Sequence, residues 1–413
     1  MPASAALEVF ASGRPAGLLT RSDIEMDTFL FGYRADCRAA DAVSLTMPVV
    51  ADQYDSMGTV HPIFEMNLPE GALLERLRLA FAKVVPSFDD LELLAIVGRS
   101  QIGRLRYAAE GSPLDPVPAQ DLKQLLTYEG TEDLFKDLLA RYAVHSGISG
   151  VQPKVLLRDA NAPVDRFTDR GATHIVKSFE PREYPELAAN EYFCMRAARH
   201  AGIAIPEVRL SQNRRILVID RFDLIADGSY LACEDFCVLS GLRSHGRYDG
   251  SYELVARRIG QFVSPEHQRS ALEQLFAMVA LSCAIENGDA HLKNFAVLYE
   301  GAQSPTRLAP AYDLVSTTVY HPRDVMALTL SGSKSFPDRR RLTAFGRRGC
   351  GLPGAKVREI LDRVEFGVSE ARTSIRQFAR QHRDFARAGE YLLAAFARGL
   401  ERSIVERTGT AGG

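Results

Sequence analysis

Residues 285–299, IENGDAHLKNFAVLY, carry polar side chains between a long apolar segment and a short one. Asp289 and Asn294 lie five positions apart there, with His291 between them, and Asp313 follows after a turn and a returning segment. One carboxylate can take a proton from a hydroxyl, while an amide and a second carboxylate can hold Mg²⁺ against phosphates. These residue types in this order therefore point to phosphoryl transfer from a nucleotide.

The spacing between Asp289 and Asn294 equals that in the catalytic loop of protein kinases, where a hairpin also separates this loop from a second Asp. A structural interpretation is equally simple. Asp and Asn are common caps and turn formers between a helix and a strand, and Asp313 has apolar neighbours that suit a buried turn acceptor. The loop alone leaves both interpretations open.

Lys177 lies in the centre of THIVKSF, an apolar segment that we expect to be a strand. Burial of an unpaired ammonium group is costly, so a buried lysine needs a partner. Glu191, on the helix expected next, is one candidate, and a nucleotide phosphate is the other; this is the arrangement of the strand lysine and helix glutamate in kinases. The alternative is that Lys177 lies on an exposed face, with its stem along the surface.

Two further segments occupy suggestive places. HSGISGVQPKVLL, residues 145–157, is a Gly/Ser loop leading into a strand, and such a loop either lays backbone N–H groups over phosphates or forms a plain turn. VIDRF, residues 218–222, stands where a kinase hinge would contact adenine with its backbone, although an edge strand ending in Asp-Arg would look the same. Only the order of all these signals along the chain favours a kinase.

Hydrophobic periodicity predicts the elements that must position these residues. Strands are expected in a hairpin over 6–20 and at 29–33, 154–159, 173–179 and 214–222. Helices are expected at 73–85, 91–98, 119–141, 186–202, 264–288, 355–366, 368–387 and 390–405.

The predicted fold class is α+β: a protein-kinase-like bilobal fold with an additional N-terminal α+β subdomain and an all-helical C-terminal lobe. We expect the N-terminal subdomain at 1–110, the α/β region like a kinase N-lobe at 111–232, and the helical lobe with the catalytic loop at 233–413. The chain of 413 residues is long enough for more than one core.

Composition excludes several classes of protein. The net charge of −2 argues against broad attraction to nucleic acid or acidic membranes. No apolar run approaches the roughly 20 residues of a membrane span, and the N-terminus lacks the pattern of a signal peptide. The six cysteines are scattered, without zinc-like spacing, and are expected to be reduced thiols. Together these features predict a cytoplasmic protein without a membrane partner.

At these motifs the sequence resembles the HipA family of bacterial serine/threonine kinase toxins. SGVQPKVLL looks like the phosphate loop of that family, THIVK like its strand lysine, NEYFC like its helix and DRFD like its hinge. GDAHLKNFAV is similar to the catalytic loop and AYDLVS to the metal-binding segment. The front part, with LLTR and FEMNLPEGALLERL, resembles the subdomain ahead of the kinase core. The resemblance covers most of the chain.

The resemblance implies Asp289 as catalytic base, Asn294 and Asp313 as Mg²⁺ ligands, and Glu191 as the partner of Lys177 in a structural ion pair. It also implies ATP as cofactor. The residues implied to bind ATP are Ser149, Gly150, Val151, Gln152, Pro153, Lys154, Lys177, Asp220, Arg221, Phe222, His291, Asn294, Tyr312 and Asp313.

The resemblance also implies a biological setting. The family pairs with a small helix-turn-helix antitoxin (HipB-like), through which any DNA contact would be indirect. Several members phosphorylate aminoacyl-tRNA synthetases, which arrests growth and is linked to persistence, so such an enzyme is one candidate substrate. Members often phosphorylate a serine in the phosphate loop, but Gly147 replaces the first serine position here, which leaves Ser149 or Ser146 for autophosphorylation.

Two other functions fit part of the pattern. GDAHLKN also resembles the loop of small-molecule phosphotransferases of the aminoglycoside or choline kinase type, although the N-terminal unit and SGVQPK argue against them. A non-enzymatic co-repressor would use the kinase fold only as a scaffold, but the complete set of Lys177, Asp289, Asn294 and Asp313 disfavours an inactive kinase.

Overall fold

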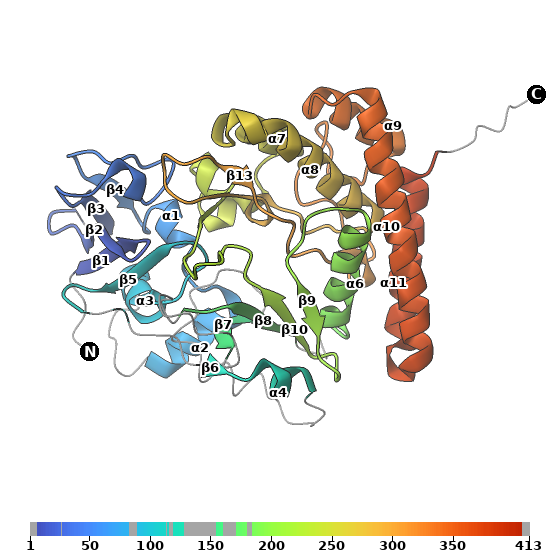
Figure 1. The fold of residues 1–413 in the computed structure, drawn as a ribbon, viewed down its shortest axis with the longest axis horizontal. Helices are drawn as coiled ribbons and strands as arrows, with labels where there is room; N and C mark the ends of the chain where they lie inside the picture. The colour runs from blue at the N-terminus through green and yellow to red at the C-terminus, as the bar shows by residue number, and fades with distance from the viewer. Residues whose placement is uncertain are drawn as a thin grey trace, which may run out of the picture. The chain divides into compact units, whose positions relative to one another are not determined.

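The computed structural model describes residues 6–25, 27–81, 89–112, 114, 119–127, 154–159, 171–179 and 184–406. The chain forms two compact units. Unit 1 consists of residues 1–179, 209–246 and 296–306, and unit 2 of residues 180–208, 247–295 and 307–413. Helices and strands occur in both, as Figure 1 shows, which confirms the predicted α+β class.

Unit 1 begins with an antiparallel sheet in the order β4-β3-β2-β1-β5. The predicted hairpin is confirmed: β1 pairs with β2, and burial alternates along β1 so that Leu7 and Val9 enter the core. The strands are β1 (Ala6–Ala11), β2 (Arg14–Arg21), β3 (Thr28–Tyr33), β4 (Tyr54–Met57) and β5 (Leu105–Ala109), and the helices are α1 (Pro62–Glu65), α2 (Gly71–Phe81) and α3 (Asp90–Val97).

A second sheet follows in the order β6-β7-β8-β10-β9, with β8 at its centre. Every residue of β8 is buried, so the strand is covered on both faces of the sheet, in keeping with the continuous apolar run around Lys177. The elements are β6 (Ala119–Gln120), α4 (Leu122–Thr127), β7 (Lys154–Asp159), β8 (His174–Ser178), β9 (Val208–Leu210) and β10 (Ile216–Asp220).

Unit 2 is mainly helical. Helix α10 packs along α6 and α8, and Figure 1 shows α10 beside α6 and α11. Helix α8 supplies the core, since every side chain from Leu275 to Ala284 is buried. The helices are α6 (Leu187–His200), α7 (Tyr252–Phe262), α8 (Pro265–Ala284), α9 (Arg339–Ala344), α10 (Gly354–Gln381) and α11 (Ala386–Gly399).

The two helices predicted at 355–366 and 368–387 are wrong, because α10 is one continuous helix. The division was placed at Gly367, which lies inside α10. A Cβ added to Gly367 would lie 2.5 Å from the backbone nitrogen of Ala201 and 2.6 Å from the carbonyl oxygen of Ala197. The glycine therefore permits close packing of α10 against the end of α6 and does not end a helix.

Other boundaries also differ. Helix α8 ends at Ala284 and not at 288, and two residues later Glu286 has a left-handed φ of 54°. The helix predicted at 119–141 begins as the short strand β6 and continues as α4, and residues 128–141 lie outside the described part. The segment after 233 is not entirely helical, because β11 (Ala232–Asp235) pairs with β12 (Ala296–Tyr299) in unit 1.

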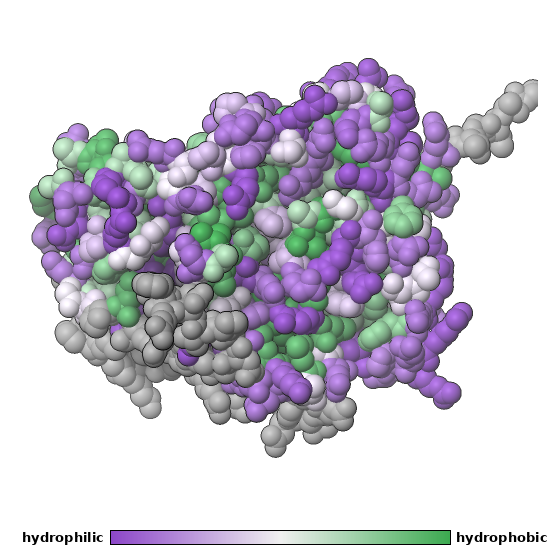
Figure 2. Space-filling view, in the orientation of Figure 1, coloured by the Kyte–Doolittle hydropathy of each residue, from purple (hydrophilic) through white to green (hydrophobic). Residues whose placement is uncertain are grey.

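All six cysteines lie in the described segments and are free, and five of them are buried, as expected of reduced thiols in a core. No helix within the described ranges is long and apolar enough to cross a bilayer. The visible surface of α10 and α11 is mainly hydrophilic, as Figure 2 shows, in keeping with helices that bury only one face.

Candidate active site

The loop after α8 is fixed by its own backbone and side chains. The N–H of Asn287 donates to the carbonyl of Ser282 at 2.8 Å, and the side-chain oxygen of Asn287 accepts from the N–H of Asp289 at 2.9 Å. The N–H of Gly288 donates to the hydroxyl of Thr317 at 2.8 Å. The end of a rigid, buried helix therefore sets the position of Asp289.

Glu286 anchors this loop to the end of the chain. Its carboxylate is buried and accepts hydrogen bonds from Arg398 at 2.7 Å, from Arg402 at 2.9 Å and from the hydroxyl of Thr318 at 2.7 Å. The two guanidinium groups and the hydroxyl compensate for the burial of its charge. The sequence reasoning missed this residue, because no local pattern links position 286 to arginines more than a hundred positions later.

Asp289 has the protonation behaviour of a general base. Its carboxylate Oδ1 accepts a hydrogen bond from the hydroxyl of Tyr248 at 2.9 Å. The pKa of Asp289 is raised to about 6, mainly by burial and also by the carboxylates of Asp313 and Asp324, against the hydrogen bond from Tyr248 and the charge of Arg247. The efficiency of a base increases as its pKa approaches the working pH.

Asp313 is close enough to Asp289 to act on its pKa, so the hairpin does bring both predicted carboxylates to one place. The backbone of Asp313 has a left-handed φ of 55°, which is unfavourable for a residue other than glycine. Strain of this kind persists where the surrounding structure imposes it, and often at functional sites.

Asn294 and His291 form a short 3₁₀ turn, Leu292–Asn294, in the same loop. The side-chain oxygen of Asn294 accepts the N–H of His291 at 3.1 Å, and the N–H of Asn294 donates to the carbonyl of His291 at 2.9 Å. Burial and then the charge of Arg247 lower the pKa of His291 to about 4, so its ring is neutral at pH 7. Tyr312 donates its hydroxyl to the carbonyl of Lys293 at 2.8 Å, beside this turn.

The donor set fits Mg²⁺. The amide oxygen of Asn294 has a second lone pair beyond the one that the N–H of His291 uses, and the carboxylate of Asp313 raises the negative charge around Asp289. Clusters of three or more His, Cys, Asp or Glu side chains that could hold a metal do not occur among the described residues. Mg²⁺ bound to nucleotide needs only one or two protein oxygens, because phosphates and water complete its coordination.

Unit 1 holds two buried lysines side by side. Lys154 on β7 pairs in register with Lys177 on β8, and the two side chains are 5% and 3% exposed. Residues directly opposite each other on antiparallel strands point to the same face of the sheet. Lys177 is buried there, so the alternative that it lies on an exposed face is wrong.

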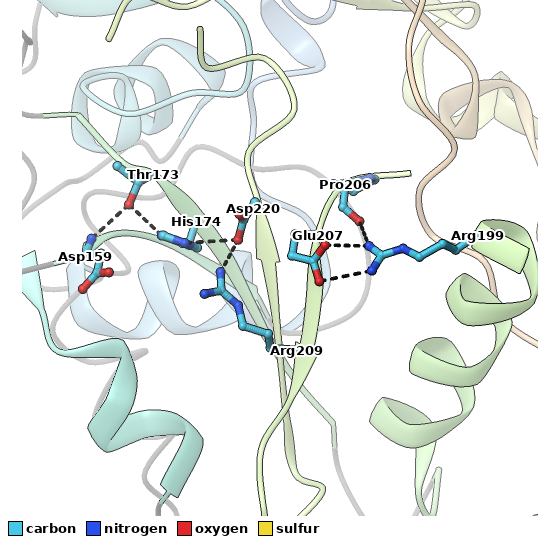
Figure 3. Close-up of polar contacts among 8 residues, drawn as sticks. All are labelled: Asp159, Thr173, His174, Arg199, Pro206, Glu207, Arg209 and Asp220. Carbon is cyan, nitrogen blue, oxygen red and sulfur yellow. Dashed lines mark hydrogen bonds and ion pairs between the residues drawn. The ribbon is translucent and has the colours of Figure 1, made fainter. Parts of the chain in front are cut away.

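The predicted hinge residues have different environments. Figure 3 shows that Asp220, at the end of β10, contacts His174 at 3.2 Å and also pairs with Arg209. Burial alone would raise the pKa of Asp220, but the hydrogen bond from His174 and the charge of Arg209 keep it below its usual value. Asp220 is therefore an ionised carboxylate that fixes the end of β10. Phe222 is half-buried.

Arg221 is an interior residue of unit 1. Its guanidinium is fully buried, pairs with Asp223 at 2.5 Å, donates to the carbonyl of Gln101 at 2.7 Å and lies over the ring of Tyr230 at 4.2 Å. Its backbone N–H donates to the carbonyl of Thr173 at 3.0 Å. The side chain thus joins the predicted hinge segment to the N-terminal region, and the role of Arg221 at the nucleotide stays a prediction.

The remaining predicted residues are only partly placed. Glu191 is a buried residue of α6, 2% exposed, and its ion pair with Lys177 stays a prediction. Ser149, Gly150, Val151, Gln152 and Pro153 lie outside the described residues.

Tyr248 and Arg247 were missed by the sequence reasoning. They belong to a short 3₁₀ turn about forty positions before the catalytic loop, where no periodic pattern or motif marks them. The ring of Tyr248 packs edge-on against His291, with centroids 5.2 Å apart. The guanidinium carbon of Arg247 lies 5.6 Å from the centroid of the Tyr248 ring.

Known proteins resemble the whole chain. The family described as HipA-like C-terminal domain matches residues 146–371, and the family described as HipA N-terminal domain matches residues 7–108. Among curated relatives, "Putative kinase Y4dM" of Sinorhizobium fredii is 28% identical over 361 residues, covering 81% of this chain and 83% of the relative. A kinase homologue of Haemophilus influenzae is 32% identical over 187 residues, covering 42% of this chain and 53% of the relative.

Among solved structures, HipA of Shewanella oneidensis MR-1, determined with HipB and operator DNA, matches with a TM-score of 0.70. The match covers 96% of this chain and 98% of that chain at 20% identity, so it supports the fold. The C-terminal family match spans more than half of the chain and includes the catalytic loop, Asp313 and both buried lysines. The chain belongs to the HipA family of kinases, as its motifs predicted.

Proposed function

We propose that this kinase transfers the γ-phosphate of ATP to a serine or threonine hydroxyl of a protein and acts as the toxin of a toxin–antitoxin pair. The observation that carries the proposal is the carboxylate of Asp289, whose pKa of about 6 suits a base, within 2.9 Å of a hydroxyl and near the carboxylate of Asp313. In this proposal, separate residues accept the proton, bind the metal and bind the phosphates.

Asp289 accepts the proton of the acceptor hydroxyl as the hydroxyl oxygen bonds to the γ-phosphorus; the bond from that phosphorus to the β–γ bridging oxygen breaks, and ADP leaves. Asn294 and Asp313 hold Mg²⁺, which supplies positive charge against the phosphates when it is bound. Lys177 and Lys154 bind phosphate oxygens, and their adjacent positions on β8 and β7 support this role. Residues 149–153 cover the phosphates in this proposal, and Asp220 and Phe222 flank the adenine.

A protein acceptor is preferred to a small molecule because the match to the HipA N-terminal domain supports an architecture beyond the phosphotransferase core. A helix-turn-helix antitoxin is the proposed partner, with DNA bound through it, since the Shewanella structure contains both HipB and operator DNA. The proposed setting is the cytoplasm, and an aminoacyl-tRNA synthetase is a candidate substrate.

The test uses the full chain with γ-labelled ATP and Mg²⁺ in a lysate. Wild type should label a discrete protein band, and Asp289→Asn should lower that labelling by several orders of magnitude, because removal of one member of such a constellation abolishes most catalysis. Asp249→Asn, an exposed aspartate in the same unit, is the matched control and should retain labelling. Equal labelling by Asp289→Asn would show that this residue is not the base.

A further inference from the structure

Tyr248 makes a direct hydrogen bond to the carboxylate proposed as the base. Its hydroxyl donates to Asp289 Oδ1 at 2.9 Å, which is the hydrogen bond that a substrate hydroxyl makes before it gives up its proton. Both residues belong to unit 2. In this geometry the phenol stands in for a substrate hydroxyl.

The position of Tyr248 allows it to leave. The residue is 41% exposed, so its ring can swing into solvent without opening the core. Its ring rests edge-on against His291, and aromatic contacts of this kind are weak. The same 3₁₀ turn carries Arg247, whose charge acts on both Asp289 and His291.

Tyr252, a neighbouring tyrosine, contacts the loop in a different way from Tyr248. Tyr252 is completely buried, and its hydroxyl donates to the carbonyl of Ala290 at 3.0 Å, one residue beyond the base. That contact braces the backbone of the loop. Tyr248 instead contacts the reacting carboxylate itself, which bracing of the loop does not require.

We propose that Tyr248 occupies the acceptor position on Asp289 in the resting kinase and is displaced by the incoming hydroxyl. It is therefore a positioning residue that makes every acceptor, including water, compete for the base. The closed contact protects ATP from hydrolysis, and only an acceptor that binds well enough to displace the phenol reaches the carboxylate. This inference rests on the proposed function of Asp289.

The test measures hydrolysis of Mg-ATP by the full chain, with water as the acceptor, so that no protein substrate has to be known. Tyr248→Phe keeps the ring and removes the hydroxyl. We expect kcat for hydrolysis to rise roughly tenfold, since a hydrogen bond to an ionised group favours the closed state by about that factor. KM for ATP should stay unchanged, because Tyr248 competes with the acceptor and not with the nucleotide.

Tyr252→Phe is the matched control, since it loses the same hydroxyl from a backbone contact and should not raise kcat. If Tyr248 only braces the loop, Tyr248→Phe will lower kcat or leave it unchanged, and the inference is then overturned. Hydrolysis by Tyr248→Phe that is insensitive to a further Asp289→Asn change would overturn the proposed function and this inference with it. Hydrolysis that depends on Asp289 and does not rise in Tyr248→Phe would overturn this inference alone.

Discussion

Replacement of Asp289 by Asn should make the protein more stable while it removes activity. Burial raises the pKa of the carboxyl from 3.8 to about 6, so the folded state binds its proton more tightly than the unfolded state does. The charged form is therefore unfavourable in the folded protein. The resulting destabilisation is absent below pH 3.8, grows between the two pKa values and is complete above about pH 6.

The size of this destabilisation follows from the shift in the pKa of Asp289. A difference of about two pKa units corresponds to about 3 kcal/mol at 1.36 kcal/mol per unit. Asn retains an oxygen that can accept the hydroxyl of Tyr248, but a neutral acceptor forms a weaker bond than a carboxylate. We therefore expect Asp289→Asn to gain about 1–2 kcal/mol near pH 8 and little near pH 3.

Urea denaturation of wild type and variant, without Mg²⁺ or nucleotide, measures this difference in the free energy of unfolding. Asp249→Asn is again the control, because an exposed aspartate should change stability by less than about 0.5 kcal/mol at either pH. The reasoning is refuted if Asp289→Asn is no more stable than wild type near pH 8. A gain of equal size near pH 3 would also refute it, since the carboxyl is then mostly protonated in both states.

Three further predictions concern the surroundings of the base. Glu286→Ala should lower the free energy of unfolding, measured in urea, by about 2–3 kcal/mol. This loss is smaller than for a fully buried ion pair, because the two arginine partners of Glu286 are partly exposed and regain water. Gly288→Ala should lower phosphate transfer in the labelling assay, since the new Cβ would lie 2.6 Å from the carbonyl oxygen of Val325 and must displace the loop. Unaltered transfer would show that the loop tolerates this movement. Lys177→Met should weaken ATP binding, measured by calorimetry, at least tenfold. The far-ultraviolet circular dichroism spectrum should stay native. An unchanged affinity would show that Lys177 does not bind phosphate.

The parts of the site that were predictable are those fixed by local spacing. Asp289 and Asn294 lie in one loop, and a short hairpin returns Asp313, so their order along the chain was enough to group them. Lys177 was identified because an ammonium group in an apolar strand demands a partner. Its neighbour Lys154 was assigned only by family resemblance, because register between strands is not visible in the sequence.

The parts that the sequence could not give depend on contacts between distant segments. The hinge role of Arg221 stays a prediction, but its side-chain contacts with Asp223 and the carbonyl of Gln101 in the interior were not visible in the sequence. Gly367 looked like the end of a helix, whereas it permits close packing of two helices. Tyr248 had no signal at all, because its role comes from a contact with a residue 41 positions away.

The anchoring of Glu286 has a consequence for the timing of synthesis. Its two arginine partners follow it by 112 and 116 positions. At roughly 5–20 residues per second, a ribosome needs roughly 6–23 seconds to add that much chain. During this interval Glu286 lacks the charges that compensate it in the folded protein. The loop that carries Asp289 therefore gains this anchor only after most of unit 2 has been synthesised.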